Sequence, residues 1–223
     1  MVAMHDGPVN SPLFASYSSG LFSYSYENNS WKKLTSAVPI AMSSGSPNLY
    51  ASFKSGTWEY DGSWRKLTNS VATKLAAIGP GSFYSVFASG LWQYEDYASR
   101  WTKIISQVPK DVVCSGSSLV VTLNSGTWKN SLNGWVKITS AVPSNIVMYT
   151  NDFFYATYAS GTWRYNNGTW TKLTSAVATK IEEVEKGYQE PVFVGNFSSG
   201  TWTFNAANGG WKKITSAQAG IIA

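Results

Sequence analysis

Residues 55–60 read Ser-Gly-Thr-Trp-Glu-Tyr and residues 64–68 read Trp-Arg-Lys-Leu-Thr, and this pair of segments recurs along the whole chain. The Ser-Gly pair occurs at positions 19–20, 55–56, 89–90, 125–126, 160–161 and 199–200. Successive glycines of these pairs are 36, 34, 36, 35 and 39 residues apart. Self-similarity at a nearly constant period indicates a repeat protein, here with six units.

Each unit carries two aromatic residues and a lysine at fixed places. The Ser-Gly pair is followed by Thr or Leu and then by an aromatic residue: Phe22, Trp58, Trp92, Trp128, Trp163 or Trp202. A second tryptophan follows within ten residues: Trp31, Trp64, Trp101, Trp135, Trp170 or Trp211. Two residues beyond it stands a lysine, which we call the repeat lysine: Lys33, Lys66, Lys103, Lys137, Lys172 or Lys213. All 11 tryptophans of the chain belong to this pattern, which excludes chance as its origin.

The second unit shows how one repeat folds. Residues 40–42, 49–53, 57–60 and 64–68 are short segments of strand composition, and the Ser-Gly and Asp-Gly pairs between them are hairpin turn signals. No segment of useful length has the period of a helix. Four short antiparallel strands per unit, repeated six times, predict an all-β protein, a six-bladed β-propeller of four-stranded antiparallel blades. We expect residues 1–223 to form a single domain.

Two terminal segments compete for the first strand of the first blade. Residues 2–4 and residues 220–223 both resemble the apolar strand at positions 40–42. We expect the C-terminal segment to fill this place, because it would tie the last unit to the first. A linear solenoid of six units is the alternative, although it would need polar caps. One long insertion, residues 182–190, precedes the sixth unit and holds four of the 12 acidic residues.

Composition narrows the classes of function. Aromatic residues make up 15% of the chain and charged residues 13%, which argues against disorder. The net charge of +5 is spread over the repeats, whereas nucleic-acid binding favours a basic patch or stripe, so no specific nucleic-acid partner is expected. A single cysteine, Cys114, gives no internal disulfide and no metal cluster. We expect no metal and no cofactor.

Enzyme chemistry and membrane insertion are not predicted. His5 is the only histidine, and no Ser-His-Asp, Cys-His, metalloprotease or phosphate-loop pattern is present. Glycosidase carboxylates leave no sequence signature, but nothing selects a pair. No run is long enough to cross a membrane, and the first residues lack the pattern of a signal peptide. We expect a cytoplasmic protein, or one released without a signal peptide of the usual kind. Homo-oligomerisation stays open.

The repeat lysine has two interpretations. On the fourth strand of a blade, a lysine prevents edge-to-edge pairing, and its stem can lie along a neighbouring tryptophan. The alternative is a set of cations that bind sulfated, phosphorylated or sialylated ligands. We favour the structural interpretation.

The third predicted strand of each unit supplies the candidate binding residues. Its aromatic side chains are expected in the core between blades, but flat rings can also stack on the C–H face of a sugar. Ser-Gly-Thr turns and Thr-Ser-Ala segments are expected on one face of the propeller, where they would supply hydroxyl groups. The candidates are tryptophans, tyrosines and threonines: Trp58, Trp92, Trp128, Trp163, Trp202, Tyr60, Tyr94, Tyr165, Thr57, Thr127, Thr162 and Thr201.

The repeat resembles the propeller lectins of the tectonin and tachylectin-2 type. The resemblance rests on Trp-x-Lys-Leu/Ile-Thr-Ser, on Gly-Thr-Trp, and on residues 49–51 (Leu-Tyr-Ala) and 154–156 (Phe-Tyr-Ala). Tectonin units have a similar length, whereas tachylectin-2 units are longer and number five. The resemblance implies equivalent sugar pockets between blades on one face. It is poorest where Phe22 replaces tryptophan and Asn130 replaces tyrosine.

The sequence therefore predicts a multivalent carbohydrate-binding protein without catalytic activity, with glycans or glycoconjugates as partners. Sites that occur once per blade add their affinities on a multivalent surface. A non-catalytic scaffold for a protein partner is the main alternative. An engineered repeat propeller without a natural ligand is a third interpretation.

Overall fold

The computed structural model describes residues 3–4, 12–131, 134–184, 192–205 and 209–217. The chain folds as two compact units, residues 1–114 and residues 115–223. The boundary between them falls within one strand, β13 (Asp111–Ser115). The single domain that the repeat predicts stays a prediction.

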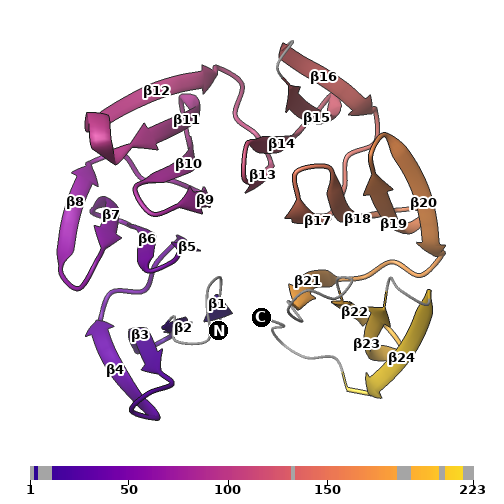
Figure 1. Ribbon diagram of the computed structural model, residues 1–223, viewed down its shortest axis with the longest axis horizontal. Helices are drawn as coiled ribbons and strands as arrows, with labels where there is room; N and C mark the ends of the chain where they lie inside the picture. Colours follow the sequence, from indigo (N-terminus) through magenta and orange to yellow (C-terminus); the bar gives the residue numbers. More distant parts are fainter. Residues whose placement is uncertain (1–2, 5–11, 132–133, 185–191, 206–208, 218–223) are drawn as a thin grey trace. The chain divides into compact units, whose positions relative to one another are not determined.

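The described chain contains six sheets of four strands each, numbered blades 1 to 6 in chain order (Figure 1). Blades 1 to 3 comprise β1 (Ala3–Met4), β2 (Leu13–Tyr17), β3 (Gly20–Ser25) and β4 (Ser30–Thr35); β5 (Ala41–Gly45), β6 (Asn48–Phe53), β7 (Gly56–Tyr60) and β8 (Trp64–Thr68); and β9 (Lys74–Gly79), β10 (Ser82–Phe87), β11 (Gly90–Glu95) and β12 (Arg100–Ile105). Blades 4 to 6 comprise β13, β14 (Ser118–Leu123), β15 (Gly126–Ser131) and β16 (Gly134–Thr139); β17 (Asn145–Thr150), β18 (Phe153–Tyr158), β19 (Gly161–Asn166) and β20 (Thr169–Thr174); and β21 (Lys180–Val184), β22 (Val192–Phe197), β23 (Gly200–Asn205) and β24 (Gly210–Thr215).

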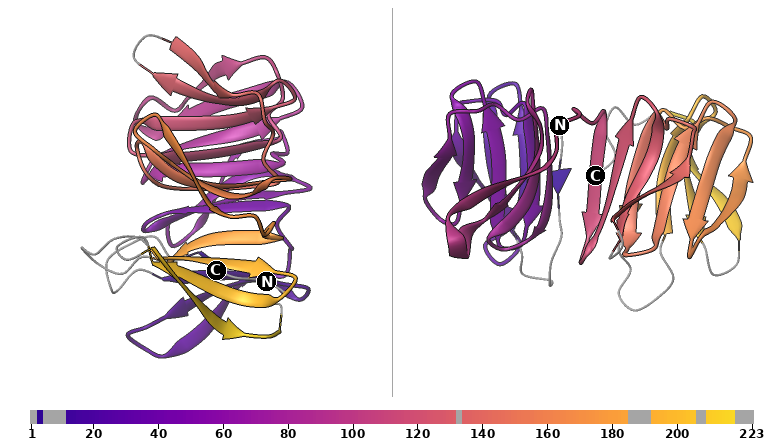
Figure 2. Two further views of the ribbon diagram at one scale, coloured as in Figure 1. Left: turned by 90° about the vertical axis from the view of Figure 1, so that its right-hand side faces the viewer. Right: turned by 90° about the horizontal axis from the view of Figure 1, so that it is seen from above.

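Neighbouring strands within a blade pair antiparallel, as short turns between them require (Figure 2). In blade 2, Trp58 lies between Ala51 and Lys66, and Tyr60 lies between Leu49 and Trp64. The predicted fold class, an all-β six-bladed propeller of four-stranded antiparallel blades, is confirmed. The one helical element in the described ranges is a 3₁₀ turn, η1 (Asp96–Ala98). Within those ranges, no helix has the length and hydropathy of a membrane span.

The first strand of blade 1 comes from the N-terminal side of the chain. Strand β1 pairs antiparallel with β2, with Ala3 opposite Ala15 and Met4 opposite Phe14. The prediction that the C-terminal segment fills this place is therefore wrong, and residues 220–223 lie outside the described residues. Residues 2–4 and 220–223 are both short and apolar, so their composition does not distinguish them. The observed pairing of Ala3 and Met4 with β2 does.

The core of each blade lies in its second and third strands. In β6, Leu49, Tyr50 and Ala51 are fully buried, whereas in β8 the residues Arg65 and Lys66 are exposed. Because the middle strands are buried on both faces, their sequences alternate only weakly between apolar and polar residues. The fourth strand is the exposed edge of the blade, where lysine is expected.

The predicted acidic insertion is partly regular structure. Strand β21 extends from Lys180 to Val184 and pairs with β22, so Glu182 belongs to a strand. Residues 185–190 of the predicted insertion lie outside the described residues.

Each Ser-Gly turn packs onto the segment that leaves the same blade. In blade 5, Gly161 has φ +124°, and a Cβ at this position would lie 2.1 Å from the main-chain oxygen of Thr174. The other five glycines of the pairs have equivalent contacts, at 2.1–2.2 Å from the corresponding oxygen. Within each blade, the Ser-Gly turn and the segment that follows the fourth strand therefore lie at the same end of the strands, as predicted.

We predict that Gly161→Ala destabilises the protein by about 3 kcal/mol or more, because it combines left-handed backbone strain with a clash against main-chain atoms. Urea-induced unfolding followed by tryptophan fluorescence measures the change. Gly168→Ala is the matched control, since Gly168 has φ +86° but open space around it, and we expect it to cost about 1 kcal/mol. Equal losses for the two variants would contradict the role of the close contact.

Candidate functional site

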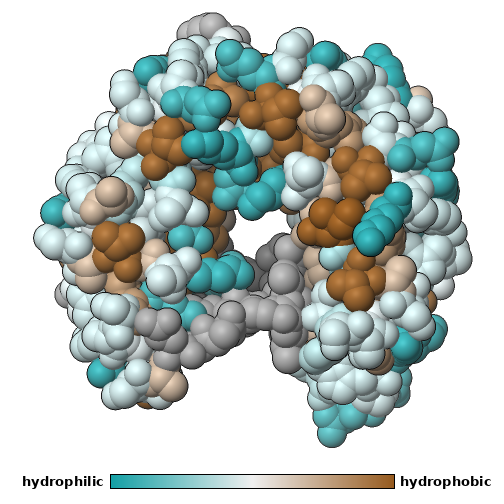
Figure 3. Space-filling model, turned by 180° about the vertical axis from the view of Figure 1, so that it is seen from behind, coloured by the Kyte–Doolittle hydropathy of each residue, from teal (hydrophilic) through white to brown (hydrophobic). Residues whose placement is uncertain are grey.

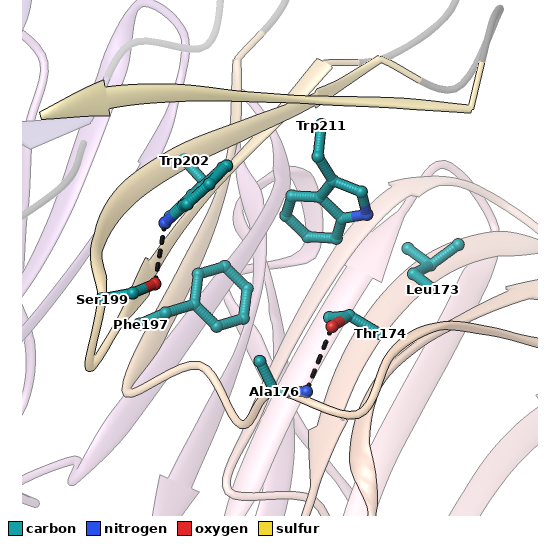
Figure 4. A pocket seen from close by; sticks show the side chains of 7 residues that line it. All are labelled: Leu173, Thr174, Ala176, Phe197, Ser199, Trp202 and Trp211. Carbon is teal, nitrogen blue, oxygen red and sulfur yellow. Dashed lines mark hydrogen bonds between the residues drawn. The ribbon is translucent and has the colours of Figure 1, made fainter.

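A cavity of about 300 Å³ lies between blades 5 and 6, both in the second unit (Figure 4). Blade 5 contributes Leu173 and Thr174 at the end of β20 and Ala176 from the loop that follows. Blade 6 contributes four side chains, three of them aromatic: Phe197, Ser199, Trp202 and Trp211. The cavity is thus built from one exit loop and from the second, third and fourth strands of the next blade.

The orientation of Trp202 is fixed by two contacts. Its indole Nε1 donates a hydrogen bond to Oγ of Ser199, 3.0 Å away. The Nζ atom of Lys213, from the neighbouring strand β24, lies 5.6 Å from the ring centroid, within the range of a cation–π interaction. This position of Lys213 over the ring agrees with the structural interpretation of the repeat lysine, and the binding of anionic ligands, its other interpretation, stays a prediction.

The same two contacts recur on every third-strand tryptophan. The indole donates to the serine three residues earlier at 3.0–3.2 Å in five blades: Trp58 to Ser55, Trp92 to Ser89, Trp128 to Ser125, Trp163 to Ser160 and Trp202 to Ser199. The repeat lysine stands over the same ring at 5.4–5.8 Å, and in blade 1 it stands over Phe22 at 5.7 Å. Five of the predicted binding tryptophans therefore have one common setting.

The constellation of Leu173, Phe197, Trp202 and Trp211 has counterparts within the units. In the first unit, Leu34 packs with Phe53, Trp58 and Trp64, and Leu67 packs with Phe87, Trp92 and Trp101. Between blades 4 and 5, the positions of Phe197, Trp202 and Trp211 are taken by Tyr158, Trp163 and Trp170, and the rings of Tyr158 and Trp170 lie 5.6 Å apart. One detail differs between the pairs of blades. Trp64 donates its indole hydrogen to the main-chain oxygen of Leu34, 3.3 Å away.

The four predicted threonines have a structural role. Thr57, Thr127 and Thr162 are fully buried, and Thr201 is 5% exposed. The hydroxyls of Thr57, Thr127 and Thr162 donate to main-chain oxygens in the exit loops of their own blades, those of Ser70, Ala141 and Ala176, at 2.9–3.1 Å. The hydroxyl of Thr201 lies 2.7 Å from Oδ1 of Asn196 and 3.1 Å from the oxygen of Ala217. A buried hydroxyl committed in this way cannot contact a ligand directly, so we leave the threonines out of the candidate site.

The three predicted tyrosines also serve packing. Tyr94 and Tyr165 are 4% and 7% exposed, and Tyr60 is partly buried. Each ring contacts the second tryptophan of its blade, with centroids 4.9–5.1 Å apart: Tyr60 with Trp64, Tyr94 with Trp101, Tyr165 with Trp170. Aromatic packing of this kind stabilises the blade. Ligand binding by these tyrosines stays untested.

Sequence reasoning missed Phe197 and Trp211 as cavity residues, whereas the serine of the Ser-Gly-Thr turn, here Ser199, was expected to supply a hydroxyl group. The second tryptophan recurs at a fixed spacing, so its signal was present, but it was assigned to the edge strand rather than to a site. Phe197 is the last residue of β22, and its counterparts Phe53, Phe87 and Tyr158 end the second strand of their blades. An aromatic residue recurs two positions before the serine of the Ser-Gly pair, and this recurrence could have identified Phe197.

The cavity is electrically neutral except at its border. Among the described residues that line it, none is Asp, Glu or His. At the counterpart position in blade 5, burial raises the pKa of Tyr158 to about 12, so its phenol is neutral at physiological pH. In the part of the chain that the structure describes, no three His, Cys, Asp or Glu side chains gather into a metal site.

No protein-family model matches the chain, and no curated protein matches its sequence at a significant level. Solved structures do resemble it. The extracellular domain of BT4673 from B. thetaiotaomicron superimposes with a TM-score of 0.69 at 10% identity, over 96% of this chain and 32% of that one. This chain therefore spans about a third of the length of that structure.

Two further similar structures have different roles. YCF48 bound to D1 peptide has a TM-score of 0.64 at 12% identity, over 93% of this chain and 80% of that chain. An ancestral GH74 enzyme has a TM-score of 0.64 at 15% identity, over 96% of this chain and 38% of that chain. Likeness at such low identity shows the β-propeller fold and nothing of function.

We predict that Thr162→Val lowers the free energy of unfolding by about 1–3 kcal/mol, because it removes the hydrogen bond to the oxygen of Ala176 and leaves that oxygen without its donor. Chemical denaturation measures the change. Thr171→Val on the exposed strand β20 is the control and should change stability by less than about 0.5 kcal/mol. A Thr162→Val protein as stable as the control would show that the hydroxyl does not hold the loop.

Proposed function

We propose that this protein is a multivalent carbohydrate-binding protein without catalytic activity, and that its ligand sites are the pockets between adjacent blades. The observation that carries the proposal is the cavity between blades 5 and 6, together with the recurrence of its residues at other pairs of blades. A site repeated once per blade suits a ligand that is itself repeated on a surface, as glycans are.

The walls of the cavity suit the two chemical faces of a sugar. Trp202, Trp211 and Phe197 offer aromatic surface to the C–H groups of a pyranose ring (Figure 4). Ser199 offers its hydroxyl, whose own proton is not used by the bond that it accepts from Trp202. The volume of about 300 Å³ lies at the lower end of the range of small-molecule sites, which suits one or two sugar rings.

The lining favours binding over cleavage. Glycoside hydrolysis uses two carboxyl groups that flank the scissile bond. The described residues that line this cavity include no carboxylate. The resemblance of the fold to a GH74 enzyme therefore does not extend to a catalytic pair in this cavity.

One observation favours the alternative, a scaffold for a protein partner. The exit loops carry valines at corresponding positions, and Val38, Val108 and Val177 are 44–50% exposed. On the face shown in Figure 3, hydrophobic residues form several separate patches among hydrophilic ones. YCF48 is one propeller that was solved with a bound peptide. Stoichiometry separates the two functions, because a scaffold binds one partner and repeated pockets bind several ligands.

We expect a glycan array to reveal at least one bound sugar, and calorimetry on that sugar to give several equivalent sites per chain. Trp202→Leu should then lower the number of sites by one, because leucine keeps apolar volume but removes the aromatic surface of one pocket. The affinity of the remaining sites should not change.

Tyr97→Ala is the matched control, since Tyr97 is an aromatic residue that is 86% exposed and lies in the η1 turn, outside the pocket. It should bind the sugar with an unchanged number of sites. A single site per chain, or a site number that Trp202→Leu leaves unchanged, would refute the assignment of the sites to these pockets. No bound sugar on the array, with one protein partner in pull-down, would favour the scaffold.

A further inference from the structure

We infer that the inter-blade pockets select anionic saccharides, that is, sugars that carry a sulfate, phosphate or carboxylate group, and that the repeat lysine binds this group. The inference rests on the proposed carbohydrate-binding function and adds the chemical class of the ligand. The residue that it adds to the proposed sites is the repeat lysine.

The register of β24 places Lys213 on the side of the blade that faces the cavity. Lys213 is paired with Trp202 on β23, and it follows Trp211 by two residues on its own strand. Residues two apart on a strand point to the same face, and cross-strand partners share a face. Lys213 therefore shares a face of the blade with Trp202 and Trp211, which both line the cavity, and its ammonium group lies 5.6 Å from the centroid of the Trp202 ring.

This placement recurs in all six blades. The distance from Nζ to the ring centroid varies only from 5.4 to 5.8 Å: Lys33 over Phe22, Lys66 over Trp58, Lys103 over Trp92, Lys137 over Trp128, Lys172 over Trp163 and Lys213 over Trp202. All six lysines are exposed residues, so their charge keeps its hydration and remains accessible to a ligand. Each blade therefore has one cation in the same position relative to its third-strand aromatic ring.

Among the described residues, no acidic side chain forms an ion pair with a repeat lysine. The ion pairs of the described residues use other cations: Arg65, Lys74, Arg100, Lys129 and Lys180. None of them involves a repeat lysine.

On the opposite face of the same hairpins, acids and bases do pair. Glu59 lies across from Arg65 on the face of blade 2 that does not carry Trp58, and the two form an ion pair. Glu95 lies across from Arg100 in blade 3 and forms another, at 3.0 Å. In blades 2 and 3 the charges on this opposite face are thus paired, and a ligand with a negative group would complement the repeat lysine on the other face.

Protection of the strand edge alone does not account for this pattern. Any charged side chain on an edge opposes pairing with another sheet, and either face of the strand would serve. Here the residue is always a cation and always stands over the aromatic ring of the pocket. An ammonium group is a point charge with three donors, so it recognises charge rather than the planar geometry of one anion. Sulfate, phosphate and carboxylate are therefore all suitable.

The test uses monosaccharides in matched pairs that differ in one anionic group: galactose with galactose 6-sulfate, glucose with glucose 6-phosphate, and glucose with glucuronic acid. The full chain carries ¹⁵N-labelled tryptophan, and the indole signal of Trp202 reports on one pocket. Its assignment comes from the signal that disappears in Trp202→Phe. We expect at least one anionic member to bind about three- to fivefold more tightly than its neutral partner.

Lys213→Met should abolish this preference at Trp202, because methionine keeps an apolar stem but has no charge. Lys212→Met is the matched control: Lys212 lies on the same exposed strand but pairs with Thr203, on the other face. It should keep the preference. The preference should also weaken when the salt concentration rises from about 0.02 to about 0.2 M.

The outcomes separate the two proposals. Equal binding of neutral and anionic sugars would overturn the selectivity and leave the carbohydrate-binding function standing. An anionic preference that both lysine variants reduce equally would reflect the net charge of the protein, and it would also overturn the inference. Binding of no sugar of either kind would overturn both proposals. Comparing the three pairs shows which anionic group is preferred.

Discussion

Two hydrogen bonds to a single exit-loop residue fix the geometry on which the cavity between blades 5 and 6 depends. In blade 5, the N–H of Ala176 donates to Oγ1 of Thr174 and its oxygen accepts from Oγ1 of Thr162, both at 3.1 Å. Ala176 and Thr174 also line the cavity. The same pair of bonds recurs in blades 2, 4 and 6. The exit-loop wall of the cavity is therefore held in place by hydrogen bonds from threonine side chains to the main chain of Ala176.

The opposite wall is held from two directions. The serine before the Ser-Gly turn accepts the indole hydrogen, and the lysine of the fourth strand stands over the ring. Both contacts limit the rotation of Trp202 before any ligand arrives. A side chain that is already ordered loses less conformational entropy on binding, so a small pocket with few polar groups can still bind usefully. The same contacts that stabilise the blade thus also prepare the site.

The fold could be predicted from the sequence because period, turn residues and alternation all agreed. The first strand of blade 1 could not, since residues 2–4 and 220–223 have the same apolar character and only pairing with β2 distinguishes them. Both Trp202 and Thr162 were predicted to bind a ligand; Trp202 lines the cavity, whereas the hydroxyl of Thr162 is bound to the main chain, and ligand binding by Trp202 stays a prediction. A hydroxyl near a turn has the same sequence signature whether it faces the ligand or the main chain. Phe197 was missed because the cavity combines strands whose proximity depends on the packing of two blades.

The repeat fixes some parts of each pocket and lets others vary, and this division has a physical reason. The glycine, the threonine and the serine contact main-chain atoms or hold a tryptophan, so replacing them would disturb the blade itself. The residue at the end of the second strand packs against the second tryptophan of its blade, and it changes from Phe197 in blade 6 to Tyr158 in blade 5. A neutral phenol in place of a phenyl ring alters polarity without altering the frame. Blades 5 and 6 therefore differ in polarity at this position, while the lysine of the fourth strand gives both the same sign of charge beside the third-strand tryptophan.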